Sequence, residues 1–185
     1  DDMLTTRSDY KKIWQINTLT EPICKDSCII LHNERNGFTG KTHVRMLVPD
    51  PTERQTQILS SSDYSNLHGP QYKIPTKIPE ASGYHIMVSP SGENKRDRFL
   101  TIFQMTKEDA KPLPVKFYEE DTRYIISLAD YVVCMNSGSE LNKTSFSISI
   151  PGNHESQVLL LDMNPGIWTV NSSDRKTEFT TTVST

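Results

Sequence analysis

The chain has 185 residues, of which 35% are hydrophobic, and its formal net charge is −3. This length suffices for one large domain or two small ones with a buried core. Acidic and basic residues are intermixed without a stripe of Lys and Arg. Nucleic acid is therefore not an expected partner, and binding of an acidic polysaccharide by this segment is disfavoured. No run approaches the roughly 18 apolar residues of a membrane-spanning helix, so no membrane partner is expected.

The first half of the chain reads as short strands separated by turn residues. Apolar or alternating runs predict strands at 13–17, 28–31, 42–48, 84–90 and 98–105. Asn36-Gly37 predicts a tight turn, and the polar stretch 52–65 is expected to hold one strand crossing a sheet face. Residues 67–83, rich in Pro and Gly, predict a long surface loop. The polar residues 91–97 predict a hairpin between the two strands that flank them.

The second half continues in the same manner. Further strands are predicted at 116–118, 123–128, 131–135, 145–150, 157–161, 168–171 and 178–183. No window carries a sustained apolar stripe of helical period. The pattern predicts an all-β fold, an antiparallel β-sandwich of many short strands, forming a single domain over residues 1–185. Asp1 to Thr5 read like the interior of a longer chain. Residues 1–9 either belong to this domain or form the edge of a preceding one.

The cysteines and acidic residues indicate no metal site and no cofactor. Cys24 and Cys28 either close a small loop or remain free, and Cys134, in an apolar run, is expected to be a buried free thiol. Zinc is excluded because no second Cys/His pair lies at ligand spacing. The acidic run Glu119-Glu120-Asp121 is a weak calcium candidate, because adjacent residues of a strand point to opposite faces.

The histidines are candidate catalytic groups, and the aromatic residues are candidate sugar-binding groups. His43 and His85 fall in alternating strands opposite the core face and are expected to face solvent, whereas His68 and His154 lie in loops. No nucleophile elbow, phosphate loop or zinc-protease motif is present. Sugar rings stack on exposed aromatic side chains. Trp14 and Trp168 lie in apolar runs and are expected in the core, which leaves Tyr64 and Tyr72, in polar loop sequence, as candidates for carbohydrate binding.

Several stretches resemble, in order, the C-terminal β-sandwich region of heparinase II/III-type polysaccharide lyases. They are residues 10–22 with their Glu-Pro turn, 45–49 with an apolar run that ends at Pro49, 83–90 with 97–100 around a Ser-Pro turn, and 161–170 with a Pro-Gly hairpin before Trp168. Two features depart from the family. No His stands near Asn17, and the chain stops at Thr185 where the family usually adds closing strands.

The resemblance implies an extracytoplasmic protein, periplasmic or secreted, that acts on acidic polysaccharide by β-elimination. The base, the acid and the groups that neutralise the uronic carboxylate then belong to a catalytic region upstream. This chain would be a non-catalytic domain whose partners are the upstream domains of the same parent protein and, in addition, polysaccharide. Two alternatives remain open: a free-standing carbohydrate-binding module and an adhesive or scaffolding domain.

Overall fold

The computed structural model describes residues 1–25, 27–63, 83–120, 122–138, 140–148, 156–171 and 176–181. The chain divides into two compact units, Asp1–Pro112 and Leu113–Thr185. The single domain expected over residues 1–185 stays a prediction. The predicted surface loop at 67–83 lies, apart from Gly83, outside the described residues.

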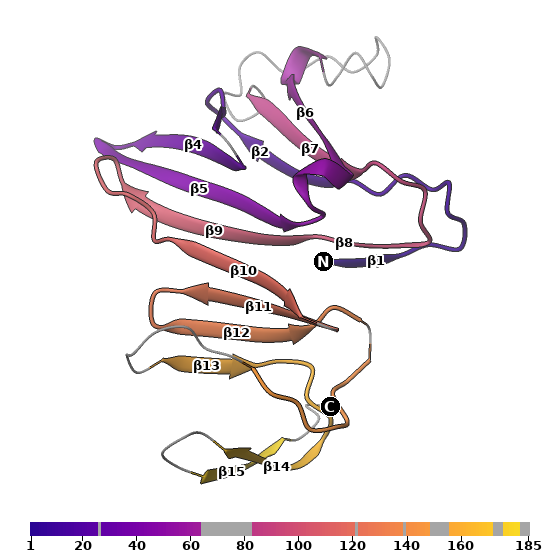
Figure 1. Cartoon of the computed structure of the whole chain (residues 1–185). Helices are drawn as coiled ribbons and strands as arrows, with labels where there is room; N and C mark the ends of the chain where they lie inside the picture. The colour runs from indigo at the N-terminus through magenta and orange to yellow at the C-terminus, as the bar shows by residue number, and fades with distance from the viewer. Residues whose placement is uncertain are drawn as a thin grey trace. The chain divides into compact units, whose positions relative to one another are not determined.

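The first unit consists of short strands and one 3-10 turn. Their bounds are β1 Asp2–Leu4, β2 Trp14–Thr18, β3 Ile23–Lys25, β4 Cys28–Arg35, β5 Phe38–Val48, η1 Pro51–Glu53, β6 Arg54–Ser60, β7 Tyr84–Pro90, β8 Arg96–Arg98 and β9 Leu100–Lys107. A three-stranded sheet has the order β2–β7–β6, and a four-stranded sheet has the order β3–β4–β5–β9. Strands β1 and β8 pair in a separate two-stranded ribbon. Figure 1 shows β8 leading directly into β9.

The core of the first unit lies between its two main sheets. Ile86 of β7 is 0% exposed and forms one buried cluster with Leu31 of β4 and Val44 of β5. Trp14 packs against this cluster and also against a second one, which contains Met46, Val88 and Phe99. Because β7 belongs to one sheet and β4 and β5 to the other, the two sheets pack face to face as a sandwich.

Two predicted connections in this unit had opposite outcomes. Asn36 and Gly37 have φ of 54° and 78° and form the two-residue link between β4 and β5. This confirms the predicted turn, since such hairpin turns need positive φ at both central residues. The hairpin predicted across residues 91–97 is wrong. Strand β7 pairs with β2 and β6, whereas β9 pairs with β5 in the other sheet, so this connection crosses between the sheets.

The second unit is a meander extended by one parallel strand and followed by a hairpin. Its strands are β10 Val115–Glu120, β11 Arg123–Leu128, β12 Tyr131–Asn136, β13 Gln157–Leu160, β14 Gly166–Asn171 and β15 Lys176–Thr181. The sheet order is β10–β11–β12–β13, and β14 pairs with β15 (Figure 1). Strand β13 runs parallel to β12, an exception to the antiparallel pairing elsewhere in the described sheets.

One face of the β10–β13 sheet carries the core of the second unit. Ile125, Val132 and Cys134 are at most 2% exposed. Phe146, Ile148 and Leu160 pack against them. The strand predicted at 145–150 is wrong for its described residues, 145–148, which have no ladder pairing. Phe146 and Ile148 instead cover the sheet face, a position for which alternating apolar residues serve equally well.

The all-β prediction is confirmed. In the described ranges, helix is confined to η1 and residues 61–63. None of the helical segments in this part of the chain is long and apolar enough to span a bilayer.

Candidate functional site

The outer face of the β2–β7–β6 sheet gathers polar side chains in three rows across the strands. In the first row Ser89 pairs with Gln55, and Ile13, the residue before β2, lies beside them. The second and third rows cross all three strands, as Gln15–Met87–Gln57 and Asn17–His85–Leu59. The pairing places these residues side by side, and the alternation of a strand places them opposite the core residues Ile86 and Val88. None of the nine is acidic.

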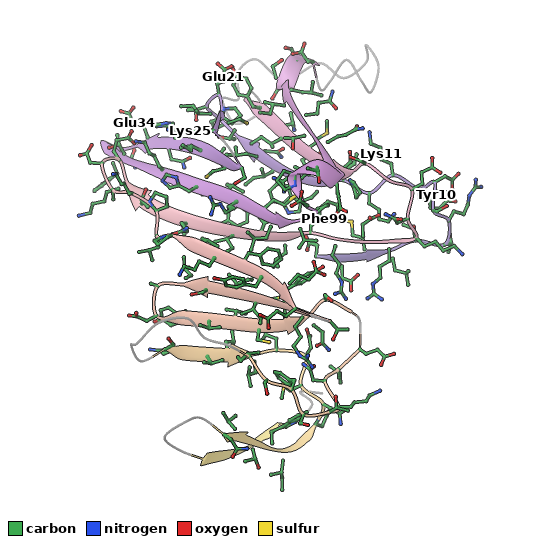
Figure 2. All side chains as sticks on the ribbon, viewed as in Figure 1. Tyr10, Lys11, Glu21, Lys25, Glu34 and Phe99 are labelled. Atoms are coloured by element: carbon green, nitrogen blue, oxygen red, sulfur yellow. The ribbon has the colours of Figure 1, made fainter. Side chains whose placement is uncertain are left out.

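A shallow hollow lies across two of these rows. Its lining residues are Lys11, Ile13, Gln55, Gln57, Met87 and Ser89. Figure 2 shows Lys11 near the start of β6, whereas its neighbour Tyr10 lies farther out on the connecting loop. Two amides, a hydroxyl and an ammonium thus surround the thioether of Met87.

The two glutamines of β6 are available to a ligand. Gln55 and Gln57 are exposed, and neither side chain has a hydrogen-bond partner anywhere in the described part of the chain. An amide offers two donor hydrogens and an acceptor oxygen. The sequence predicted a strand within the polar stretch 52–65, but Gln55 and Gln57 were not identified from sequence, and neither was Lys11.

The third row is already engaged within the protein. His85 Nδ1 lies 2.9 Å from Asn17 Oδ1 and 3.0 Å from Gln15 Nε2, and Gln15 Nε2 donates to Asn17 Oδ1 at 2.9 Å. His85 Nε2 lies 3.5 Å from Ser61 Oγ. Burial lowers the pKa of His85. His85 faces outward as predicted, but it is half-buried and held in a side-chain network.

The expectation that His43 faces solvent is wrong. It does point away from Val44, but it is 8% exposed. Strand β5 is internal to its sheet, so His43 lies between Ile30 of β4 and Gln104 of β9, and its Nε2 is 3.1 Å from Thr106 Oγ1. Alternation gave the correct face but not the burial, because burial depends on the neighbouring strands.

All three cysteines are free. Cys24 pairs in register with Ile29, and Cys28 pairs with Lys25, so neighbouring positions of the β3–β4 ladder carry the two thiols on opposite faces. This arrangement resolves the open alternative against a bridge. Burial raises the pKa of both thiols. Cys134 is 1% exposed, which confirms the predicted buried thiol.

The remaining sequence candidates have mixed outcomes. Tyr64 and Tyr72, the predicted sugar-binding residues, lie outside the described residues, as do His68, His154 and Asp121. Glu119 and Glu120 occupy successive positions of β10 and so point to opposite faces. No group of three His, Cys, Asp or Glu residues gathers as a metal site among the residues that the structure describes.

The two tryptophans are half-buried rather than free platforms. Trp14 contacts both core clusters of the first unit and lies 6.3 Å from Phe103 between ring centroids. Trp168 donates its Nε1 hydrogen to Asn164 O at 2.8 Å.

In the second unit, Arg123 and Asn142 form a partly buried polar pair. Asn142 is 6% exposed, and its Oδ1 accepts a hydrogen bond from Arg123 Nη2 at 3.2 Å. The Arg123 guanidinium also lies 4.1 Å from the centroid of the Phe146 ring, a cation–π contact. These contacts attach the covering segment to the sheet, so we assign the pair a structural role.

A known protein family matches the C-terminal part of the chain. Residues 117–185 match the family model of the heparinase II C-terminal domain. Over these residues the chain is similar to the heparinase II C-terminal domain, and the resemblance to heparinase II/III-type lyases is confirmed there. Residues 161–170 fall inside the match, whereas the other similar stretches fall outside it. No curated protein matches the chain.

The matched segment coincides with a structural division. It begins inside β10, the first strand of the second unit, and runs to the end of that unit. The sheet-face hollow lies in the first unit and is not covered by the match.

Proposed function

We propose that this chain is a non-catalytic β-domain region of an exported heparinase II/III-like polysaccharide lyase. In this proposal it packs against an upstream catalytic region of the same protein, and that region degrades acidic polysaccharide by β-elimination. The observation that carries the proposal is the coincidence between the heparinase II C-terminal match at 117–185 and the compact unit Leu113–Thr185.

The surroundings of the described histidines support a non-catalytic role. β-elimination needs a base for the proton next to the uronic carboxylate, an acid for the leaving oxygen and a cation for the carboxylate. His43 contacts Thr106, His85 contacts Asn17 and Gln15, and His32 Nδ1 lies 3.4 Å from Glu108 Oε1. Each of these rings serves a local structural contact.

Apolar side chains on β9 support packing against another domain. Phe103 and Met105 pair in register with Val44 and Thr42, so they lie on the core-facing side of the sheet. Nevertheless Phe103 is 47% exposed and Met105 is 85% exposed. An apolar surface that continues a core outward is typical of interdomain contacts.

An activity assay tests the catalytic part of the proposal. The purified chain, incubated with uronic-acid polysaccharides, should produce no ultraviolet absorbance from unsaturated uronic products. The upstream catalytic region of the proposal should produce it. Turnover by the purified chain that disappears when one of its own residues is substituted would refute the non-catalytic assignment.

A binding assay tests the packing part. Met105→Lys should weaken association between the chain and the upstream region by about tenfold or more, because it places a charge in an apolar contact. Met105→Leu, which keeps an apolar side chain, should bind nearly as well as the natural chain. Equal association of all three forms would exclude this surface.

A further inference from the structure

We infer that the outer edge of β13 is a self-association surface, to which a second copy of this chain adds its own β13 in antiparallel orientation. The inference goes beyond the proposed function, because it assigns a partner to the second unit and involves neither β9 nor a catalytic region. A two-fold axis joins the β10–β11–β12–β13 sheets of the two copies into one continuous sheet.

The outer edge of β13 carries backbone groups without partners. β13 is the last strand of its sheet, as Figure 1 shows. The N–H groups of Gln157 and Leu161 donate to carbonyl oxygens on or beside β12, at 2.7 and 2.9 Å. Because backbone groups alternate in direction along a strand, those of Val158 and Leu160 point away from β12, where no residue of the described ranges accepts or donates. Another extended strand is the partner that satisfies such a row of donors and acceptors.

The sequence of β13 does nothing to keep another strand away. Charged residues, proline and bulges commonly protect a sheet edge. β13 (Gln157–Leu160) has no charged residue and no proline, and its register with β12 is regular. Asp162, just beyond the strand, directs Oδ2 to its own chain, where it accepts from Asn136 N at 3.0 Å. A copy of the same uncharged strand therefore meets no charge repulsion.

Other edge strands are less suited to self-pairing. Strands β3, β6, β9 and β10 each contain a lysine or an arginine. Strand β2 is uncharged, but its exposed side chains are the polar Gln15 and Asn17. Strand β14 is uncharged and exposes Ile167, yet none of the core clusters found in the described residues includes a residue of β14.

The apolar side chains of β13 complement themselves. Val158 is 42% exposed and Leu159 is 54% exposed. In the antiparallel pairing, Val158 exchanges both of its backbone hydrogen bonds with Leu160 of the second copy, and the two-fold axis passes beside Leu159. Leu159 then stands opposite its own copy in a non-hydrogen-bonded pair, the position at which cross-strand side chains approach most closely.

The pairing also continues the core of the second unit. Val158 and Leu160 pair in register with the core residues Val132 and Cys134, and Leu160 packs against that core. The exposed Val158 therefore lies at the rim of the core, on the face where Leu160 of the second copy covers it. An exposed apolar rim of this kind is typical of a protein contact surface.

Sedimentation equilibrium of the purified chain tests the inference. A pair of short strands buries less than the roughly 1,200–2,000 Å² of a stable interface, so we expect a weak dimer with a Kd on the order of 0.1 mM. Between about 10 μM and 1 mM protein, the average mass should rise from that of one chain toward that of two. The mass of one chain throughout this range would overturn the inference.

Val158→Pro tests the backbone pairing. Proline removes the outward N–H of this residue and leaves the hydrogen bonds between β13 and β12 in place. The variant should keep the circular dichroism spectrum of the natural chain and dimerise at least about tenfold more weakly. Val158→Ile, which keeps the N–H and an apolar side chain, is the matched control and should dimerise like the natural chain. Equal dimerisation of the two variants would refute pairing through this edge.

Leu159→Lys tests the position of the two-fold axis. The substitution places two ammonium groups opposite each other, so dimerisation should weaken by about tenfold or more. Ile167→Lys, at a 76% exposed position of β14, is the control and should leave the dimer unchanged. Loss of the dimer in Ile167→Lys but not in Leu159→Lys would assign self-association to β14 and overturn the inference.

These outcomes are separable from the proposed function. Met105→Lys is expected to weaken association with the upstream region and to leave the dimer intact, whereas Leu159→Lys is expected to do the reverse. Failure of either association therefore leaves the other untouched.

Discussion

Lys12 and Asp97 form a buried ion pair in the first unit. Nζ and Oδ2 are 2.7 Å apart, and the side chains are 4% and 9% exposed. Lys12 Nζ also donates to Asn94 O. The pair joins the segment before β2 to β8, far along the chain, and so fixes the approach to the first row of the outer sheet face.

Removal of one member of this pair should be costly. Asp97→Asn or Lys12→Met should lower the free energy of unfolding by about 3–5 kcal/mol, because the remaining charge stays buried without its partner. Urea unfolding followed by circular dichroism measures the effect. Arg7→Met, which breaks the exposed pair with Asp9, is the control and should change stability by less than about 1 kcal/mol. Similar losses for the exposed and buried pairs would contradict this prediction.

Gly83, immediately before β7, should not tolerate a side chain. Its φ is +130°, and a Cβ atom there would overlap the carbonyl oxygen of Thr18. Gly83→Ala should therefore destabilise the first unit by about 1–3 kcal/mol. Gly138 has open space around its Cβ position, so Gly138→Ala should stay within about 0.5 kcal/mol. Comparison of the two urea midpoints tests the prediction, and a Gly83→Ala midpoint equal to that of the natural chain would contradict it.

His85 should make stability depend on pH. Burial lowers its pKa in the folded state below the ordinary value of 6.5. The unfolded chain therefore binds the proton more readily, and the contribution of His85 is fully present above about pH 6.5 and declines as the pH falls below it. Free energies of unfolding measured between about pH 5 and 8 should show this slope, and His85→Gln should reduce it. An unchanged slope in the variant would assign the pH dependence to other groups.

Trp14 should be a stability residue. It packs against both buried clusters of the first unit. Trp14→Ala should cost about 3–5 kcal/mol because it opens a cavity between the sheets, and Trp14→Phe should cost less. Chemical denaturation followed by far-ultraviolet circular dichroism avoids dependence on the lost fluorophore. A loss below about 1 kcal/mol for Trp14→Ala would mean that the side chain is mainly a surface group.

Local sequence was sufficient for most strands and for one turn, because those depend on neighbouring residues. Asn36-Gly37 adopts positive φ wherever it occurs in a tight hairpin, and the alternation within 42–48 assigned the core face of Val44 correctly. The partner of a strand is not encoded locally. The link at 91–97 therefore read as a hairpin, although the strands on either side of it join different sheets.

The site was harder to predict, because it is assembled across three strands. Gln15, Met87 and Gln57 are far apart in sequence and meet only through the ladder register. A single polar side chain in an alternating strand resembles an ordinary exposed residue. The aromatic residues chosen from sequence, Tyr64 and Tyr72, lie outside the described ranges, so their role in sugar binding stays a prediction.

The parallel pairing of β12 with β13 has a consequence for the order of folding. Strands β10, β11 and β12 are joined by short links and can pair one after another. Strand β13 can pair with β12 only after the long connection between Asn136 and Gln157 has closed. Phe146 and Ile148 of that connection pack beneath the sheet. The entropic cost of closing this long connection predicts that β13 joins the sheet after β10, β11 and β12 have paired. Until it does, β12 presents an unpaired edge, the state in which the second unit is most prone to mispair with another copy.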